Sequence, residues 1–339
     1  MKLKQSTLLL ASALLSFNLQ AAQTTDAIAP EVASGFTAKA SVSADNFMVA
    51  AANPLAVKAG YEVLKTGGTA IDAMVAVQAM LGLVEPQSSG LGGGAFLVYY
   101  DAESKKLTTF DGRETAPMAA TPELFQDENG KPLKFFDAVV GGRSVGTPGT
   151  VKLMAELHAR YGNQNWARLL KPAQTAAEQG FAVSPRLAGA IAKDQKRLSR
   201  YPDTQAYFFT SDGKPLAEGS LLKNPDYAQT LATLAKEGSA AFYHGQIGQD
   251  IVNRVNNIPD NPGLLTRQDL ANYQIKERSV TCAPYRQYDI CGMGPPSSGA
   301  LTVGQILGIS SHFDLKTMGA DNPQSWQIIG DASRLAFAD

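Results

Sequence analysis

The stretch SSGLGGGAF at residues 88–96 constrains the fold most, because it places four glycines between a long apolar segment and a strand-like run. Glycine loses more backbone entropy on folding than any other residue, so this density indicates a turn with close backbone packing. GLGGGA fits the loose G-x-G-x-x-A spacing of dinucleotide-binding loops, but such loops follow a strand and open a helix. Here a helix comes first, and the Gly-Lys-Ser/Thr of a Walker loop is absent. The segment therefore predicts a turn from a buried helix into a sheet, not a phosphate site.

Local patterns predict the elements on either side of this turn. Residues 69–85 are apolar nearly all round a helix, begin at a threonine cap and end before a proline, which indicates a buried helix. Residues 95–101 and 106–113 are predicted to be paired strands joined by a polar turn. Residues 47–54 are predicted to be a strand that runs into a turn. Helical patterns dominate the chain after residue 148.

The N-terminus carries a targeting pattern. MKLK is a short basic region, STLLLASALLSFNL is a short apolar region and QAAQ supplies small residues for cleavage, so residues 1–22 are predicted to be a secretory signal peptide. Residues 23–44 are predicted to be a flexible leader, and residues 45–339 the folded domain. The mature protein is expected to be periplasmic or secreted. The net charge of −1 gives no electrostatic reason to expect nucleic acid or an anionic membrane as partner.

The sequence contains two cysteines, Cys282 and Cys291, which flank the segment APYRQYDI. Alternating tyrosine and isoleucine suggest two strands, with RQ as the turn. A hairpin would bring the two sulfurs together, and an oxidising compartment would favour a disulfide. Two separate buried thiols are the alternative. A zinc site is disfavoured, because two cysteines without a nearby histidine do not supply four ligands.

A serine hydrolase is a second candidate class, because GRSVG places Ser144 in the G-x-S-x-G spacing. A nucleophile elbow requires a helix directly after the serine, whereas here the sequence VGTP intervenes. Ser144 is therefore predicted to be a loop residue. The three histidines, His158, His244 and His312, are predicted to lie at the surface or at helix ends, and none shares the helical spacing of a metal site.

Arg113 lies in FDGRETAP, where a predicted strand ends, and its guanidinium could bind a substrate carboxylate through paired hydrogen bonds. Asp111 and Glu114 are its neighbours in sequence, so a structural ion pair is the alternative, and from chemistry alone it is favoured. Ser297 and Ser298, in GPPSSGA, are predicted to shape a loop and begin a helix.

Several separate motifs occur in a fixed order along the chain: GGTAIDAMVAVQAMLGLVEPQSSGLGGGAFLVYYD, FDGRETAP, VGTPGTV, GLLTRQDLANYQ and GPPSSGALTVGQIL. Together they resemble gamma-glutamyltransferases, over residues 46–339. Two positions depart from the expected pattern, because Gly294 and Ala300 stand where that family is expected to have proline and glycine.

The resemblance implies an α+β fold, the four-layer αββα sandwich of N-terminal-nucleophile hydrolases, of which this chain would supply the large-subunit part. It implies a precursor that cuts itself into two subunits. The new N-terminal threonine of the small subunit then attacks the gamma-glutamyl amide of glutathione or a related compound. Arg113 matches the family's arginine that holds the substrate α-carboxylate, which raises the binding role above the ion pair. The glycine segment is implied to be scaffold, and no metal or organic cofactor is implied.

No threonine of this chain matches the family's nucleophile motif, so no catalytic residue is assigned and the chain alone is expected to be inactive. Three functions are considered. The first is gamma-glutamyl transfer and hydrolysis by a longer protein, and the second is an acylase acting on glutaryl-type β-lactam side chains. The third is an exported binding protein without catalysis. The expected partners are a gamma-glutamyl substrate, an acceptor amino acid, dipeptide or water, and the small subunit from the same precursor.

Overall fold

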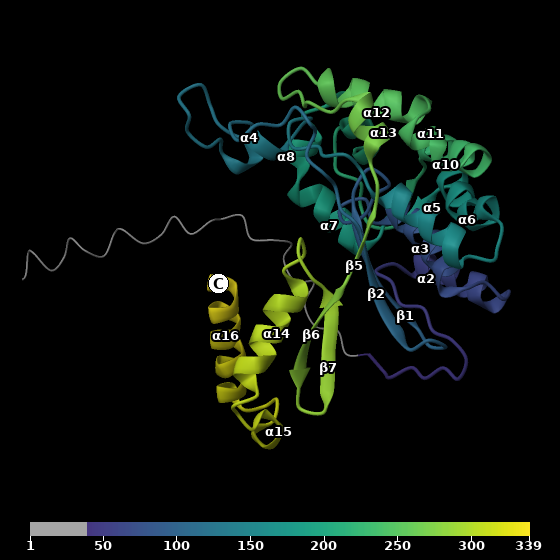
Figure 1. Cartoon of the computed structure of the whole chain (residues 1–339). Helices are drawn as coiled ribbons and strands as arrows, with labels where there is room; N and C mark the ends of the chain where they lie inside the picture. The colour runs from purple at the N-terminus through teal and green to yellow at the C-terminus, as the bar shows by residue number, and fades with distance from the viewer. Residues whose placement is uncertain (1–38) are drawn as a thin grey trace, which may run out of the picture. The chain divides into compact units, whose positions relative to one another are not determined.

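The computed structural model describes residues 39–339 (Figure 1). The chain divides into two compact units, residues 1–43 and 44–339, and the fold given below is that of the second unit. The predicted signal peptide and most of the predicted leader lie outside the described residues, and residues 39–44 are exposed without regular structure. Among the described residues, the structure contains no helix long and apolar enough to cross a bilayer.

The described chain is a helical protein with three small antiparallel sheets. The strands are β1 (Ala95–Asp101), β2 (Lys106–Gly112), β3 (Phe181–Ala182), β4 (Leu221–Leu222), β5 (Lys276–Arg278), β6 (Val280–Tyr285) and β7 (Tyr288–Met293). The helices are α2 (Pro54–Lys65), α3 (Ala70–Val84), α4 (Phe135–Val139), α5 (Thr150–Tyr161), α6 (Trp166–Gln179), α7 (Pro185–Lys193), α8 (Gln195–Leu198), α9 (Pro202–Phe208), α10 (Pro225–Glu237), α11 (Ala240–Tyr243), α12 (Gln246–Asn256), α13 (Arg267–Asn272), α14 (Gly299–Ser310), α15 (Leu315–Met318) and α16 (Pro323–Ala338).

Helix α3 forms the centre of the helical layer, where it packs against α2, α5 and α6 (Figure 1). It begins at a capping box, in which the Thr69 hydroxyl accepts from the backbone N–H of Asp72 at 3.1 Å and the Asp72 carboxylate accepts from the backbone N–H of Thr69 at 2.9 Å. Most of its side chains are buried on every side, as its apolar composition predicts. The glycine segment follows directly and leads into β1.

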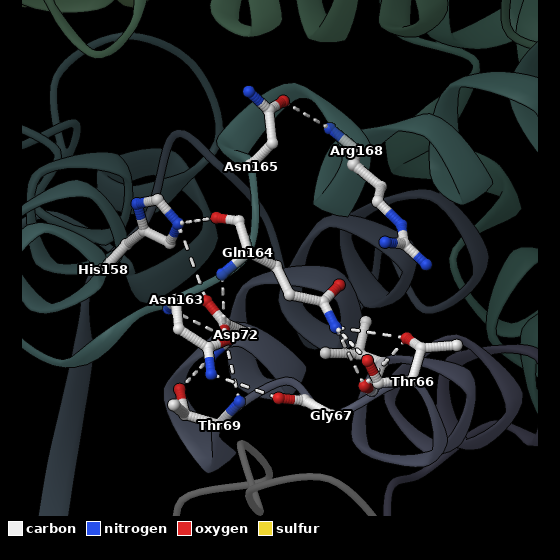
Figure 2. A network of polar contacts seen from close by, with 10 residues as sticks. Thr66, Gly67, Thr69, Asp72, His158, Asn163, Gln164, Asn165 and Arg168 are labelled. Atoms are coloured by element: carbon white, nitrogen blue, oxygen red, sulfur yellow. Dashed lines mark hydrogen bonds and ion pairs between the residues drawn. The ribbon is translucent and has the colours of Figure 1, made fainter.

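The carboxylate of Asp72 also ties the start of α3 to the loop after α5 (Figure 2). Its Oδ2 accepts from the backbone N–H groups of Asn163 at 3.1 Å and Gln164 at 3.3 Å. His158, in the last turn of α5, places its Nε2 2.8 Å from the Gln164 carbonyl oxygen and 3.6 Å from Asp72 Oδ1. The ring also packs against Trp166. The prediction of a helix end is correct for His158, but the residue is half-buried within this polar network rather than at the surface.

Strands β1 and β2 pair in antiparallel register, with Ala95 opposite Gly112, and β5 adds to the far edge of β2. The β6–β7 hairpin contacts β1 and β2, while α14 packs on the hairpin and α16 packs on α14 (Figure 1). On the opposite side of β2, Phe110 is fully buried against Leu153 and Leu157 of α5. The layers therefore run helix, sheet, sheet, helix, which confirms the predicted α+β, αββα class.

The predicted strand in residues 47–54 is wrong, since these residues lie in no strand and pair with none of the described ones. Two of their side chains, Phe47 and Val49, pack along α2 instead. The Phe47 ring lies 5.4 Å from the Tyr61 ring, and Val49 lies against the backbone at Gly60. Apolar side chains in a short segment can pack on the surface of a helix as well as in a sheet. Here α2 partly covers Phe47 and Val49.

The predicted hairpin at the two cysteines is confirmed. Cys282 and Cys291 lie directly opposite each other in β6 and β7 and form a disulfide, with their Cα atoms 4.1 Å apart. Arg286 lies at the predicted turn with φ 57°. The covalent link joins the two strands just before the loop of residues 294–298, which begins α14.

Candidate functional site

Arg113 is the first residue after β2, and its guanidinium has no ion-pair partner among residues 39–339. Asp111, the neighbouring acid, is only 7% exposed. Its Oδ2 accepts from Arg278 Nε of β5 at 2.8 Å rather than from Arg113. Its Oδ1 accepts from the backbone N–H of Arg113 at 3.0 Å. Among the described residues, the Arg113 Nη1 donates to the carbonyl oxygen of Pro296 at 3.4 Å, and the guanidinium lies over the Phe96 ring, 6.0 Å from its centroid. The structural ion pair considered for Arg113 is therefore made by another arginine, and the Arg113 charge remains available.

The glycine segment lies against the backbone at Arg113. A Cβ added at Gly94 would lie 2.6 Å from Glu114 Oε2 and 2.8 Å from the Cα of Arg113. The Gly93 carbonyl oxygen accepts from the backbone N–H groups of Gly149 at 2.9 Å and Thr150 at 3.1 Å, at the start of α5. This is the close backbone approach that the density of glycines predicts, and it joins the end of α3, the Arg113 loop and α5.

The motif GLLTRQDLANYQ supports the same loop from the other side. The Tyr273 hydroxyl, just after α13, donates to the carbonyl oxygen of Arg113 at 2.8 Å, across 160 positions of sequence. Asp269 Oδ1 accepts from the backbone N–H of Met118 at 2.9 Å. Burial raises the pKa of Tyr273, and the nearby charges of Asp111 and Glu114 raise it further, so its hydroxyl remains a donor at neutral pH. Both ends of the Arg113 loop are thus held by one short helix.

Asp269 makes this support sensitive to acid. Burial opposes ionisation, but the Thr266 hydroxyl and the backbone N–H groups of Met118 and Thr266 donate to the carboxylate, and the pKa of Asp269 is lowered overall. A lowered pKa in the folded state adds stability above the unfolded value of about 4, and this stability is lost as the pH falls through the folded value.

We expect Asp269→Asn to lower the melting temperature of the complete protein by about 2–6 °C at pH 7, since a cap and a charged tie worth about 1–2 kcal/mol are lost. The difference from the wild type should shrink as the pH falls from about 5 to 3, measured by thermal melts in matched buffers. Asp314→Asn is the control for an exposed carboxylate at a helix start, because Asp314 is the N-cap of α15 and accepts from the backbone N–H of Thr317, but its side chain is exposed, so its loss should cost less stability. A difference that is the same at every pH would contradict this role.

Two cavities adjoin at the Arg113 loop. One, of about 310 Å³, is lined by Asp111, Tyr273, Lys276, Arg278 and Pro296 together with residues 113–115. The other, of about 430 Å³, lies on the side of residues 143–146. A larger cavity of about 670 Å³ lies between α2 and α6, away from Arg113, and is lined mainly by apolar groups. The charged groups are therefore concentrated at the Arg113 loop, which is the candidate functional site.

The other sequence candidates do not join this site as reactive groups. Ser144 is a loop residue, six positions before α5, and its hydroxyl donates to the Val139 carbonyl oxygen at 2.9 Å. The Ser297 hydroxyl accepts from the backbone N–H of Gly299 at 3.1 Å, and Ser298 is the cap position of α14. His244 and His312 are exposed. Within the described part of the chain, no group of three histidine, cysteine or acidic residues could hold a metal ion.

The site and fold can be compared with known proteins. Residues 56–339 match the family model described as Gamma-glutamyltranspeptidase. The chain belongs to the gamma-glutamyltranspeptidase family. Its sequence is 39% identical over 292 residues to the glutathione hydrolase proenzyme of Bacillus subtilis (strain 168), covering 86% of this chain and 49% of that protein. The chain thus spans about half the length of the curated relatives it matches.

Solved structures agree with this assignment. The Helicobacter pylori gamma-glutamyltranspeptidase superposes with a TM-score of 0.82 at 33% identity, covering 88% of this chain and 84% of that chain. A cephalosporin acylase from Bacillus halodurans superposes with a TM-score of 0.77 at 29% identity, covering 92% of this chain and 57% of that chain. The two neighbours are named for different activities, one as a transpeptidase and one as an acylase.

Sequence reasoning assigned only Arg113 to the site. Tyr273 and Asp269 lie in a motif quoted for the family resemblance, but nothing in the local pattern indicates that they hold the Arg113 loop. Arg143 also lines the cavity beside the Arg113 loop, but within GRSVG the G-x-S-x-G spacing points to the serine. A signal was present, since an arginine between glycines in a loop has few acidic neighbours in sequence to neutralise it.

Proposed function

We propose that the complete protein transfers gamma-glutamyl groups from glutathione and related amides to water or to the amine of an amino acid or dipeptide. The family membership and the glutathione hydrolase relatives support the reaction class. The observation that carries the proposal is the guanidinium of Arg113, which has no ion-pair partner among the described residues and borders a cavity of about 310 Å³. Arg113 would form charge-assisted hydrogen bonds with the α-carboxylate of the gamma-glutamyl group.

The nucleophile of the proposed reaction is a threonine in a segment beyond these 339 residues. Its hydroxyl oxygen would attack the gamma-carbonyl carbon, and its own α-amine would take the hydroxyl proton and pass it to the leaving amine. The resulting ester would then be cleaved by water or by the acceptor amine, which frees the threonine. No metal or cofactor takes part in these steps.

A small subunit cut from the same precursor is the proposed partner of this chain. Two apolar faces within the described part of the chain support this partner. Val98 and Tyr100, on the face of β1 away from the helices, are 47% and 58% exposed. Leu335 and Phe337, near the end of α16, are 62% and 76% exposed. Apolar side chains that are exposed together in this way are suited to cover by a partner.

We further propose that the protein is exported to the periplasm or secreted. The basic, apolar and small-residue regions of residues 1–22 support export. The disulfide between Cys282 and Cys291 supports an oxidising compartment, because such bonds are rare in reducing ones.

An acylase acting on glutaryl-type side chains of β-lactams is the second candidate, favoured by the likeness to the cephalosporin acylase. A glutaryl group lacks the α-amine of a gamma-glutamyl group but keeps the carboxylate that Arg113 would bind. The two candidates therefore share Arg113 and differ in the groups around the amine.

Release of p-nitroaniline by the complete protein tests both candidates. We expect turnover of gamma-glutamyl-p-nitroanilide that increases when glycylglycine is added as acceptor, and little turnover of glutaryl-p-nitroanilide. The reverse preference would favour the acylase. No turnover of either compound would overturn the proposed function and favour a binding protein without catalysis.

A further inference from the structure

The cavity of about 430 Å³ adjoins, at the Arg113 loop, the cavity proposed to hold the gamma-glutamyl group. Residues 113–115 form the wall that the two cavities share. Among the other residues that line it, Pro117, Leu124, Phe125 and Val145 are apolar, Ser144 is polar and Arg143 is a cation. A substrate placed on Arg113 in the first cavity would therefore have a second charged cavity beside it.

Arg143 is held in a fixed position in this cavity. Its Nε donates to the Asn261 Oδ1 at 2.7 Å, and its Nη1 donates to the Leu124 carbonyl oxygen at 2.8 Å. Asn261 is only 3% exposed, and its amide nitrogen donates to the Val140 carbonyl oxygen at 2.7 Å. The backbone carbonyl oxygen of Asn261 also accepts from the backbone N–H of Gly142, at 2.7 Å. A buried asparagine thus orients the guanidinium before any ligand arrives.

The partners of Arg143 are all neutral. Within residues 39–339 its guanidinium forms no ion pair, and its Nη2 donates to no described group. Glu114 lines the same cavity but pairs with neither Arg143 nor Arg113 in the described structure. A half-buried cation that faces a cavity and forms no ion pair is suited to an anionic ligand, and a guanidinium is best matched by a carboxylate.

We propose that Arg143 binds the free carboxylate at the far end of the peptide whose gamma-glutamyl bond is cleaved or formed. The ligand class is an amino acid or short peptide with a free C-terminal carboxylate, either as the leaving group or as the acceptor. This inference rests on the proposed function. Arg113 and Arg143 then select the two carboxylates of one substrate, and Leu124 and Phe125 contact the apolar part of the peptide between them.

The test compares glutathione with glutathione amide, in which the glycine carboxylate is replaced by a carboxamide. For the wild-type complete protein, we expect kcat/KM to be about 10-fold higher for glutathione, since a charge-assisted pair is lost with the amide. Arg143→Gln should reduce this ratio to about 1, mainly through KM for glutathione. Arg254→Gln, which removes an exposed arginine of α12, should keep the wild-type ratio.

A second variant keeps the test informative if Arg143→Gln does not fold. Ser144 is exposed and lines the same cavity, so Ser144→Asp places a carboxylate beside Arg143 without removing its hydrogen bonds. The glutathione to glutathione amide ratio should fall about 10-fold in Ser144→Asp but not in the neutral variant of the same size, Ser144→Asn.

Two results would overturn the inference while the proposed function stands. One is a wild-type protein that cleaves both compounds equally well. The other is an Arg143→Gln variant that loses activity on both compounds by the same factor, which would mark Arg143 as a support of the loop at residues 137–143 only. By contrast, a wild-type protein that turns over no gamma-glutamyl compound, gamma-glutamyl-p-nitroanilide included, would overturn the proposed function itself.

Discussion

Arg113→Ala should lower kcat/KM for gamma-glutamyl-p-nitroanilide by about 30- to 900-fold, because the loss of a paired carboxylate contact costs on the order of 2–4 kcal/mol in transition-state binding. The loss should be seen mainly as a raised KM, since the α-carboxylate is bound in the ground state as well as in the transition state. Arg113→Lys keeps the positive charge but cannot form a bidentate contact with a carboxylate. Its kcat/KM should therefore lie between those of the wild type and the alanine variant.

The structure makes this prediction specific to Arg113. Asp111 already pairs with Arg278 at 2.8 Å, so removal of the Arg113 side chain leaves no buried acid without a partner. The melting temperature of Arg113→Ala should therefore stay close to that of the wild type. Arg160→Ala, which removes an exposed arginine of α5, is the control for loss of a positive charge. An unchanged kcat/KM in Arg113→Ala would remove Arg113 from the site.

Gly94→Ala should lower kcat/KM by about 10- to 100-fold while leaving the arginine itself in place. The added methyl group would lie 2.6 Å from Glu114 Oε2, 2.8 Å from the Arg113 Cα and 2.8 Å from the Glu114 backbone nitrogen. The backbone at Arg113 has to shift to relieve these contacts, and the guanidinium moves with it. Overpacking of this kind also costs about 1–3 kcal/mol of stability, so the melting temperature should fall by several degrees.

Gly90→Ala is the matched control for Gly94→Ala. It adds the same methyl group to the same segment, where the nearest atom would be the Gly92 backbone nitrogen at 4.0 Å. We therefore expect kcat/KM and the melting temperature of Gly90→Ala to stay close to those of the wild type. A loss seen in Gly94→Ala alone would then come from displacement of Arg113 and not from alanine in the segment as such. Equal behaviour of the two variants would contradict the scaffold role assigned to Gly94.

Local structure could be predicted where short-range chemistry decides it. The buried helix of residues 69–85 has a cap, an apolar surface and a proline stop, and the hairpin of Cys282 and Cys291 has alternation and a two-residue turn. The strand expected in residues 47–54 is wrong because Phe47 and Val49 pack on α2, and the same apolar pattern fits packing on a helix as well as pairing in a sheet. Short apolar runs do not specify which neighbour will cover them.

The site was less accessible to prediction from sequence, because it depends on contacts between distant segments. The bond from Tyr273 to Arg113 spans 160 positions, and that from Asp269 to Met118 spans 151. The sequence alone favours an ion pair between Arg113 and the nearby Asp111. In the fold, β5 places Arg278 beside Asp111, and Arg278 forms the ion pair instead. The role of Arg113 came from the family resemblance and not from spacing, and Asn261 as a support of Arg143 had no local signal.

Intact mass spectrometry of the complete protein, purified from its native cells and denatured, tests the central claim most directly. We expect two chains from one precursor. The first contains Arg113 and Arg143, and the second begins with the threonine that acts as nucleophile. A single uncut chain, or a second chain that begins with another residue, would contradict the proposed self-processing gamma-glutamyl transferase.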